Sequence, residues 1–70
     1  MSDTIDMADL DPVEQPDPAN PFRIGDVAYH KYRDLDGRGV VAVAGMGIRI
    51  QIGTLATDWL DCTVYEKADA

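Results

Sequence analysis

The clearest pattern along the chain is a pair of apolar segments on either side of a glycine-rich turn. Residues 40–44 (VVAVA) form a continuous apolar run, which fits a strand packed on both faces. Residues 48–52 (IRIQI) alternate apolar and polar side chains with the period of a strand. Because the short segment 45–47 (GMG) allows a tight reversal between them, the pattern predicts a β-hairpin with all three isoleucines facing inward.

A further strand is predicted before this hairpin. Phe22 and Ile24 lie two positions apart, and the alternation resumes one position out of phase at Val27 and Tyr29. A glycine at such a shift is typical of a bulge or sharp bend in a strand, and Gly25 occupies this position. The segment therefore predicts a bent first strand.

The segments on either side of the hairpin complete the set of elements. Residues 34–39 (DLDGRG) read as a loop. After the hairpin, Thr57 and Asp58 are suited to cap a single 3₁₀ turn through residues 59–60, and residues 62–66 (CTVYE) follow as a closing strand. Together these elements predict an all-β fold class, a small barrel of four to five strands with a short 3₁₀ turn before the last strand.

The N-terminal segment differs from this domain in charge and in proline content. Residues 1–20 carry six acidic and no basic side chains, whereas the rest of the chain carries seven acids against six bases. Prolines at positions 12, 16, 18 and 21 favour a semi-extended spacer and exclude a helix or an inner strand. We therefore divide the chain into an acidic arm (1–20), a barrel (21–67) and a frayed end (68–70), with the arm either disordered or docked on a partner.

As a docking arm, this segment would place apolar side chains between carboxylates. The apolar anchors are Ile5, Met7 and Leu10, and the flanking carboxylates are Asp3, Asp6, Asp9 and Asp11. Such an arm fits a protein partner with a basic surface and an apolar groove, to which its charge would steer it. The spacer would add a reach of ~34 Å at polyproline rise, and open barrel edges invite strand addition or oligomer formation.

Three short motifs resemble the SH3-like barrels of the KOW and Tudor type. They are FRIGDV (22–27), GRGVVAV (37–43) and Trp59-Leu60 ahead of the closing strand. In such barrels the IGD-V opening enters the first strand, the G-x-G-V step enters the second, and a 3₁₀ turn precedes the last. The resemblance covers about 46 residues and implies RNA, DNA, methylated side chains or proteins as ligands, without selecting among them.

A KOW-type nucleic-acid or ribonucleoprotein-binding module, gated by the acidic arm, is the alternative function. Its face would comprise Arg23, Lys31, Arg33, Arg38 and Arg49, with Tyr29 or Tyr32 stacking on a base. The loop departs from that pattern, because two aspartates (Asp34 and Asp36) accompany its arginine, and the arm opposes phosphate binding. A methyl-reader would instead need an aromatic cage from Tyr29, Tyr32, Trp59 and Tyr65, although a tryptophan at this position more often plugs one end of such a barrel.

Catalytic chemistry has little support in the sequence. His30 is the single histidine and fits the surface or the barrel mouth, and Cys62, the single cysteine, shares the register of neighbouring apolar residues and fits the core. Asp58 and Asp61 are better suited to capping a turn than to sharing a proton. We expect no enzyme activity, no cofactor and no metal, because structural zinc needs four soft or imidazole ligands.

The sequence therefore predicts a non-enzymatic protein-interaction or assembly module that docks through its acidic arm and a barrel edge. We find no leader sequence, and the longest apolar run is too short to span a bilayer, so we expect a cytoplasmic or virion location without membrane contact. The Arg-over-Lys, Ala/Val/Asp/Gly-rich usage suits a phage accessory or virion component.

Overall fold

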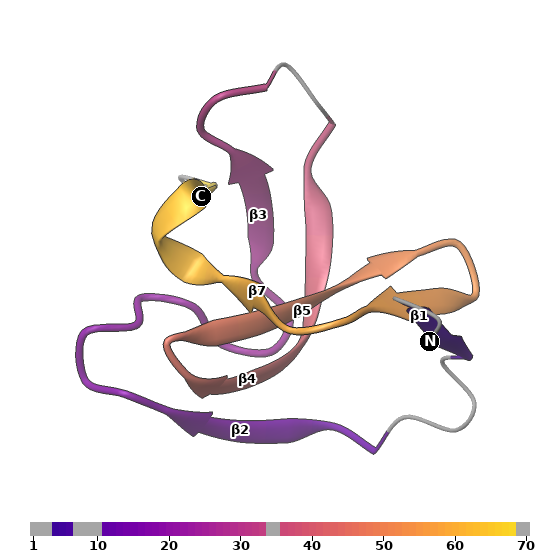
Figure 1. Ribbon diagram of the computed structural model, residues 1–70, viewed down its shortest axis with the longest axis horizontal. Helices are drawn as coiled ribbons and strands as arrows, with labels where there is room; N and C mark the ends of the chain where they lie inside the picture. The colour runs from indigo at the N-terminus through magenta and orange to yellow at the C-terminus, as the bar shows by residue number, and fades with distance from the viewer. Residues whose placement is uncertain (1–3, 7–10, 34–35, 69–70) are drawn as a thin grey trace.

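The described part of the chain is all-β, as the sequence predicts. The computed structural model describes residues 4–6, 11–33 and 36–68 (Figure 1). In chain order the elements are β1 (Thr4–Asp6), β2 (Val13–Pro16), β3 (Val27–His30), β4 (Arg38–Gly45), β5 (Gly47–Ile52), β6 (Leu55–Thr57), β7 (Leu60–Asp61), the 3₁₀ turn η2 (Cys62–Val64) and β8 (Tyr65–Lys67).

The predicted hairpin is confirmed in β4 and β5. The two strands pair antiparallel from Ala44–Gly47 to Val40–Ile50, and Gly45 takes a φ of 54° in the turn, a conformation that favours glycine. One detail of the prediction is wrong: Ile48 and Ile50 are buried, but Ile52 is 45% exposed. The reason is that the pairing with β4 stops at Ile50, so Ile52 extends past the covered part of the sheet.

Strand β4 organises the sheet because its two edges have different partners. One edge pairs with β5. The other is shared by two strands: β3 pairs antiparallel with its first residues, and β2 pairs parallel with residues 42–45. The change of partner coincides with a register shift between Val40 and Ala42, which is how a bulge bends a strand.

The outer edge of β5 is shared in the same way. It pairs with β7 at Gly47 and Ile48 and with β6 at Gln51 and Ile52. Between these two pairings, the backbone N–H of Ile50 donates to the side-chain oxygen of Thr57 at 3.2 Å. A side chain thus satisfies a donor that a continuous ladder would have paired with backbone.

The sheet is not closed into a barrel in the described residues. The strand order is β1-β6-β5-β4-β3-β8, with β2 on β4 and β7 on β5, and no pairing joins β8 to β1. In Figure 1 the β3 end of the sheet stands nearly upright against the β4–β5 ribbon, so the sheet folds over on itself without closing. Where the sequence predicts a barrel, the described residues thus form an open, strongly bent sheet.

The core lies inside this bend. It is formed by Phe22, Ala28, Val40, Val43, Ile48, Ile50 and Cys62, with Leu60 and Tyr65 packed against it. Burial of Cys62 confirms its predicted place in the core, at 3% exposure. Phe22 is fully buried although it lies outside any strand, so the segment between β2 and β3 supplies the largest core side chain.

The structure differs from the predicted spacer in the acidic segment. Residues 13–16 form β2 and residues 4–6 form β1, which pairs antiparallel with β6. Proline excludes an inner strand but not an edge strand, and β2 has only β4 as a neighbour. The segment 1–20 is thus not a separate arm where the structure describes it, because part of it completes the sheet.

Two predicted boundaries are also shifted. The first strand begins at Val27 instead of Phe22, because residues 24–25 form a turn in which Gly25 takes a φ of 96°. The 3₁₀ turn is Cys62–Val64 instead of residues 59–60, so the closing strand is only Tyr65–Lys67. Asp61 is the N-cap of the turn, because its side chain accepts the backbone N–H of Thr63; the cap thus lies three residues after Asp58, the predicted position.

Candidate functional site

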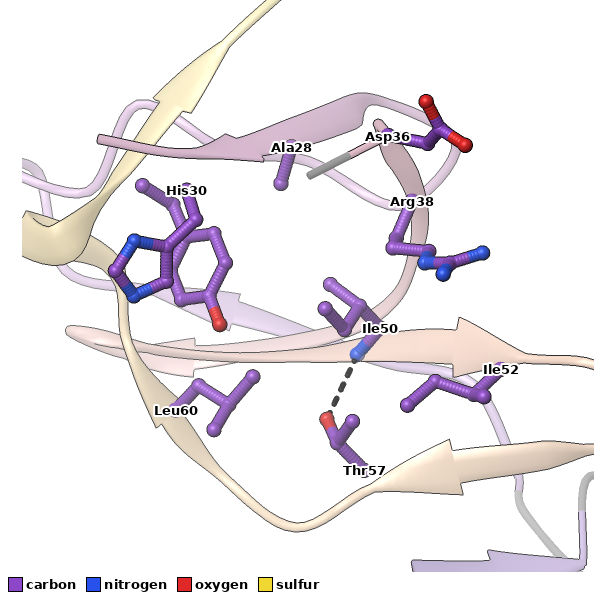
Figure 2. A pocket seen from close by; sticks show the side chains of 9 residues that line it. Ala28, His30, Asp36, Arg38, Ile50, Ile52, Thr57 and Leu60 are labelled. Atoms are coloured by element: carbon purple, nitrogen blue, oxygen red, sulfur yellow. Dashed lines mark hydrogen bonds between the residues drawn. The ribbon is translucent and has the colours of Figure 1, made fainter. Parts of the chain in front are cut away.

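The open side of the bent sheet contains a cleft of about 240 Å³. Its apolar wall comes from four strands and consists of Ala28, Ile50, Ile52, Leu60 and Tyr65. Its polar rim consists of His30, Asp36, Arg38 and Thr57. Figure 2 shows Ala28 and Ile50 facing each other across the cleft, with His30 at one end and Asp36 and Arg38 at the other.

The cleft exists because the wall strands diverge. β3 and β8 form one side, whereas β5, β6 and β7 form the other, and in the described residues the two sides are joined only through β4. Ala28 offers only a methyl group, so the space opposite Ile50 is left unfilled. Ile52 is 45% exposed here, an apolar side chain at the mouth of an apolar hollow.

His30 is held in one orientation at its end of the cleft. Its Nδ1 accepts the backbone N–H of Tyr32 at 3.1 Å, and its ring makes edge contacts with Tyr65 at 5.1 Å and with Tyr32 at 6.0 Å. In the neutral imidazole, an accepting Nδ1 leaves the proton on Nε2. The ring is therefore fixed with one donor, Nε2–H, still to be satisfied by water or a ligand.

The opposite end of the cleft carries one fixed charge of each sign. Asp36 and Arg38 are both exposed, and within residues 4–6, 11–33 and 36–68 neither makes a hydrogen bond or salt bridge through its side chain. Figure 2 shows both charged groups directed out of the cleft mouth. Counted with His30, the rim offers more donors than acceptors, which favours a ligand that carries carbonyl or carboxylate oxygens.

The residues of the predicted nucleic-acid face separate into two groups. Arg23 and Arg49 are engaged elsewhere: Arg23 donates to the backbone oxygens of Asn20 and Phe22, and Arg49 pairs with Asp58 at 3.5 Å. The remaining five lie on β3, on the turn after it and at the start of β4, and all are exposed: Tyr29, Lys31, Tyr32, Arg33 and Arg38. Tyr32 is the most open of these, at 77%.

The four aromatics of the predicted cage do not converge. Tyr65 lines the cleft and Tyr32 contacts the His30 ring, but Tyr29 pairs opposite Glu66 on the other face of the β3–β8 ladder. Trp59 lies outside the core at 41% exposure, with the Arg49 guanidinium 4.8 Å from its ring centre. The expectation that Trp59 plugs one end of the fold is therefore wrong, because a cation–π contact holds it on the surface.

The residues predicted to carry arm docking are placed only in part. Ile5 and Asp6 lie in β1, paired with Ala56 and Leu55, and Asp11 is exposed ahead of β2. Asp3, Met7, Asp9 and Leu10 lie outside the described residues. The structure thus draws Ile5 and Asp6 into a strand ladder and leaves Asp11 in solvent.

Sequence reasoning missed the residue that ties the acidic segment to the hairpin. Asn20 is 1% exposed; its amide nitrogen donates to the carbonyl oxygens of Gly45 at 2.8 Å and Gly47 at 3.3 Å, and its Oδ1 accepts the N–H of Phe22. The same Gly45 oxygen accepts the N–H of Asp17 at 2.9 Å. The one available signal was an Asx residue next to a proline-rich turn, which indicates a turn but not a distant partner.

Two groups near the site have shifted pKa values. Burial raises the pKa of the Cys62 thiol, with a smaller contribution from the Asp61 charge, so the neutral thiol is favoured. The hydrogen bonds from the backbone and hydroxyl of Thr63 lower the pKa of Asp61, which keeps this cap ionised. Neither group gives a reactive nucleophile or a general base at neutral pH.

Across the described ranges no group of three or more His, Cys, Asp or Glu side chains is arranged to hold a metal ion, and no helix is long and apolar enough to cross a membrane. A scan against protein-family models, a search of curated proteins and a search of solved structures each found no match to this chain.

Proposed function

We propose that this chain is a non-enzymatic protein-interaction or assembly module that binds its partner at the cleft. The observation that carries this proposal is the apolar hollow left open by the bent sheet, with the half-exposed Ile52 at its mouth. At about 240 Å³ it is smaller than the ~300–1,000 Å³ of pockets that enclose drug-sized ligands. A hollow of this size suits an anchoring side chain of a partner better than a cofactor.

The acidic side chains on the opposite part of the sheet support a basic partner surface. Asp11, Glu14 and Asp17 are exposed on and beside β2, and the whole chain has a net charge of −7. Such a field accelerates encounter with a basic protein and weakens with salt. In this proposal the acidic segment both completes the sheet and steers the protein toward its partner. The N-terminal residues of the segment would also dock on that partner.

An SH3-like relationship of the KOW and Tudor type is part of the proposal. It is supported by the position of the motifs: the IGDV step leads into β3, the G-R-G-V step opens β4, and η2 directly precedes β8. β1 and β2 would then be additions to that core. We also propose that the protein is a phage accessory or virion component, located in the cytoplasm or in the virion.

The experiment is a pull-down with the full chain, with and without nuclease, using point variants at the cleft. Deleting residues 1–20 is unsuitable because it removes β2 from β4. We expect a nuclease-resistant protein partner that is lost with Ile52→Glu, since a carboxylate at the cleft mouth opposes apolar contact. Met46→Glu is the matched control, because Met46 is similarly exposed at 38% but lies in the β4–β5 turn. Equal capture by both variants would exclude the cleft as the docking site.

Nucleic-acid binding is the second candidate, favoured by the exposed Lys31-Tyr32-Arg33 turn that follows β3. An open tyrosine between two cations is suited to stacking on a single-stranded base. We expect this reading to hold only if a nuclease-sensitive signal is lost in Tyr32→Ala and falls steeply with salt. A signal that is insensitive to Tyr32→Ala would remove this candidate.

A further inference from the structure

The cleft also has features that specify the chemistry of the partner. We infer that it takes one large apolar side chain of an extended peptide that has an acidic residue two positions away, with the carboxylate paired to Arg38. This inference rests on the proposed function, because it names which segment of a protein partner occupies the site. It commits to a peptide; a nucleic-acid base at the same place is an outcome of the test.

Shape and polarity together favour an apolar side chain inside the cleft. The polar groups of the lining there are the hydroxyls of Tyr65 and of Thr57, which accepts the N–H of Ile50 at 3.2 Å; the rest is the aliphatic carbon of Ala28, Ile50, Ile52 and Leu60. A polar group placed there would lose water without gaining a partner from these side chains, which is costly. An aliphatic or phenyl group would instead bury apolar surface on both sides.

The rim favours oxygen acceptors beside that side chain. Within the described residues no hydrogen bond is made by Nε2 of His30 at one end, and the Arg38 guanidinium is exposed at the other. A peptide backbone carbonyl suits the first and a carboxylate suits the second, because guanidinium–carboxylate pairs are charge-assisted and often bidentate. Asp36 lies at the same end of the cleft as Arg38, and its negative charge repels a second acidic residue. We therefore expect one acidic residue in the peptide instead of an acidic run.

The size of the cleft limits its occupant to a single large side chain. With about 240 Å³, the hollow has no space for a second large side chain or for a nucleotide with its sugar and phosphate. The partner must therefore present its anchor singly, from an extended segment that passes over the mouth between His30 and Arg38. The alternation of side chains in an extended peptide meets this condition, since the residues next to the anchor point away from the cleft and the residue two positions away returns to the side of Arg38.

The test is an NMR titration of the full chain with blocked tetrapeptides. The reference is N-acetyl-Glu-Ser-Leu-Ser-amide, with one version that has Ala for Leu and one that has Lys for Glu; methyl signals of Ala28, Ile50, Ile52 and Leu60 report binding at the cleft. We expect the Ala peptide to bind about tenfold or more weakly, from the lost apolar contact. The Lys peptide should be severalfold weaker, and in Arg38→Glu the preference between Glu and Lys should reverse.

Four outcomes overturn the inference. Equal binding of the Leu and Ala peptides excludes an apolar anchor, and an unchanged Glu preference in Arg38→Glu excludes the ion pair. Cleft signals that move with an eight-nucleotide oligothymidine but not with any peptide assign the site to nucleic acid. No movement with either probe means that the cleft binds neither. A partner captured through Ile52 in the pull-down would still support the proposed function in any of these cases, so the two failures are distinguishable.

Discussion

The two sides of β4 show two different ways of completing a sheet. On one side β5 follows immediately through a tight turn, pairs antiparallel and places Ile48 and Ile50 in the core. On the other side β2 is parallel, follows Pro12 and ends at Pro16, and two of its four side chains are exposed while the other two are half-buried. The first side is stabilised by buried apolar surface; the second is held by backbone pairing and by Asn20.

This difference teaches what the acidic segment does in the fold. A long apolar strand such as β4 would offer an open edge to other chains if β2 were absent. β2 covers part of that edge and itself ends in a residue, Pro16, that has no N–H to donate. The segment therefore protects the edge of β4 from pairing with other chains, and β2 itself is a poor template for a further strand.

The largest effect is expected on the hairpin side. Ile48→Ala should lower the free energy of unfolding by about 2–5 kcal/mol, because Ile48 is fully buried in the core. A chain of this length has about 4–10 kcal/mol in total, so much of the cooperative transition would be lost. Ile52→Ala is the control, since that side chain is 45% exposed. Urea unfolding followed by tryptophan fluorescence measures both, and equal losses would contradict the assignment of Ile48 and Ile52 to core and surface.

On the β2 side we expect a smaller loss from Asn20→Ala. The substitution leaves the N–H of Phe22 without its partner. It also removes a donor from the partly buried carbonyl oxygens of Gly45 and Gly47, so we expect a cost of about 1–3 kcal/mol. Gln15→Ala on β2 should change stability by less than about 0.5 kcal/mol because Gln15 is exposed. Hydrogen exchange should show faster exchange of β2 amides in Asn20→Ala than in the parent chain. Unchanged β2 protection would mean that Asn20 does not hold this strand.

The rate of Cys62 alkylation distinguishes the hairpin side of β4 from the β2 side. Cys62 is buried, its raised pKa favours the unreactive thiol, and its N–H donates to Met46 in the hairpin turn. We expect alkylation to be at least about tenfold slower in the folded chain than in urea. Ile48→Ala should accelerate labelling strongly and Gln15→Ala should not. Rapid labelling of the folded parent chain would contradict the buried placement.

The smallest effect is a pH dependence at the cap of η2. Because hydrogen bonds lower the pKa of Asp61 in the folded chain, its carboxylate stabilises the fold above the ordinary Asp pKa. That contribution is lost as pH falls through the lowered folded value. Asp61→Asn should therefore reduce the difference in melting temperature between pH 7 and pH 3. An identical pH profile in the variant would show that the cap charge does not contribute.

How much the sequence predicted depends on whether the signal was local. The hairpin followed from apolar runs and glycines within a dozen residues, and the core place of Cys62 followed from its apolar neighbours. The edge pairing of β2 was missed because prolines at 12 and 16 argue against a strand and carry no information about a partner in β4. Trp59 was misplaced because its contact with Arg49 joins β5 to the segment between β6 and β7, which pattern alone does not align.

The candidate site was predictable only at its rim. Arg38, Tyr65 and His30 were identified by residue type, since charge and aromaticity are visible in a sequence. The cleft itself was not, because it arises from the divergence of two halves of a sheet and from the small size of Ala28. Ile52 was expected to face the core for the same reason: alternation gives the face of a strand but not how far the opposite layer extends.

The parallel pairing of β2 has a consequence for the order of assembly. β4 and β5 meet through a turn of a few residues, whereas roughly thirty residues separate the paired positions of β2 and β4, and contacts between distant segments form late. By this argument β2 is translated early but joins late, after its own edge on β4 has been built. In that interval the vacant edge is equally open to β2 of a neighbouring copy. High concentration during refolding should then yield strand-exchanged dimers that dilution alone returns slowly to monomers.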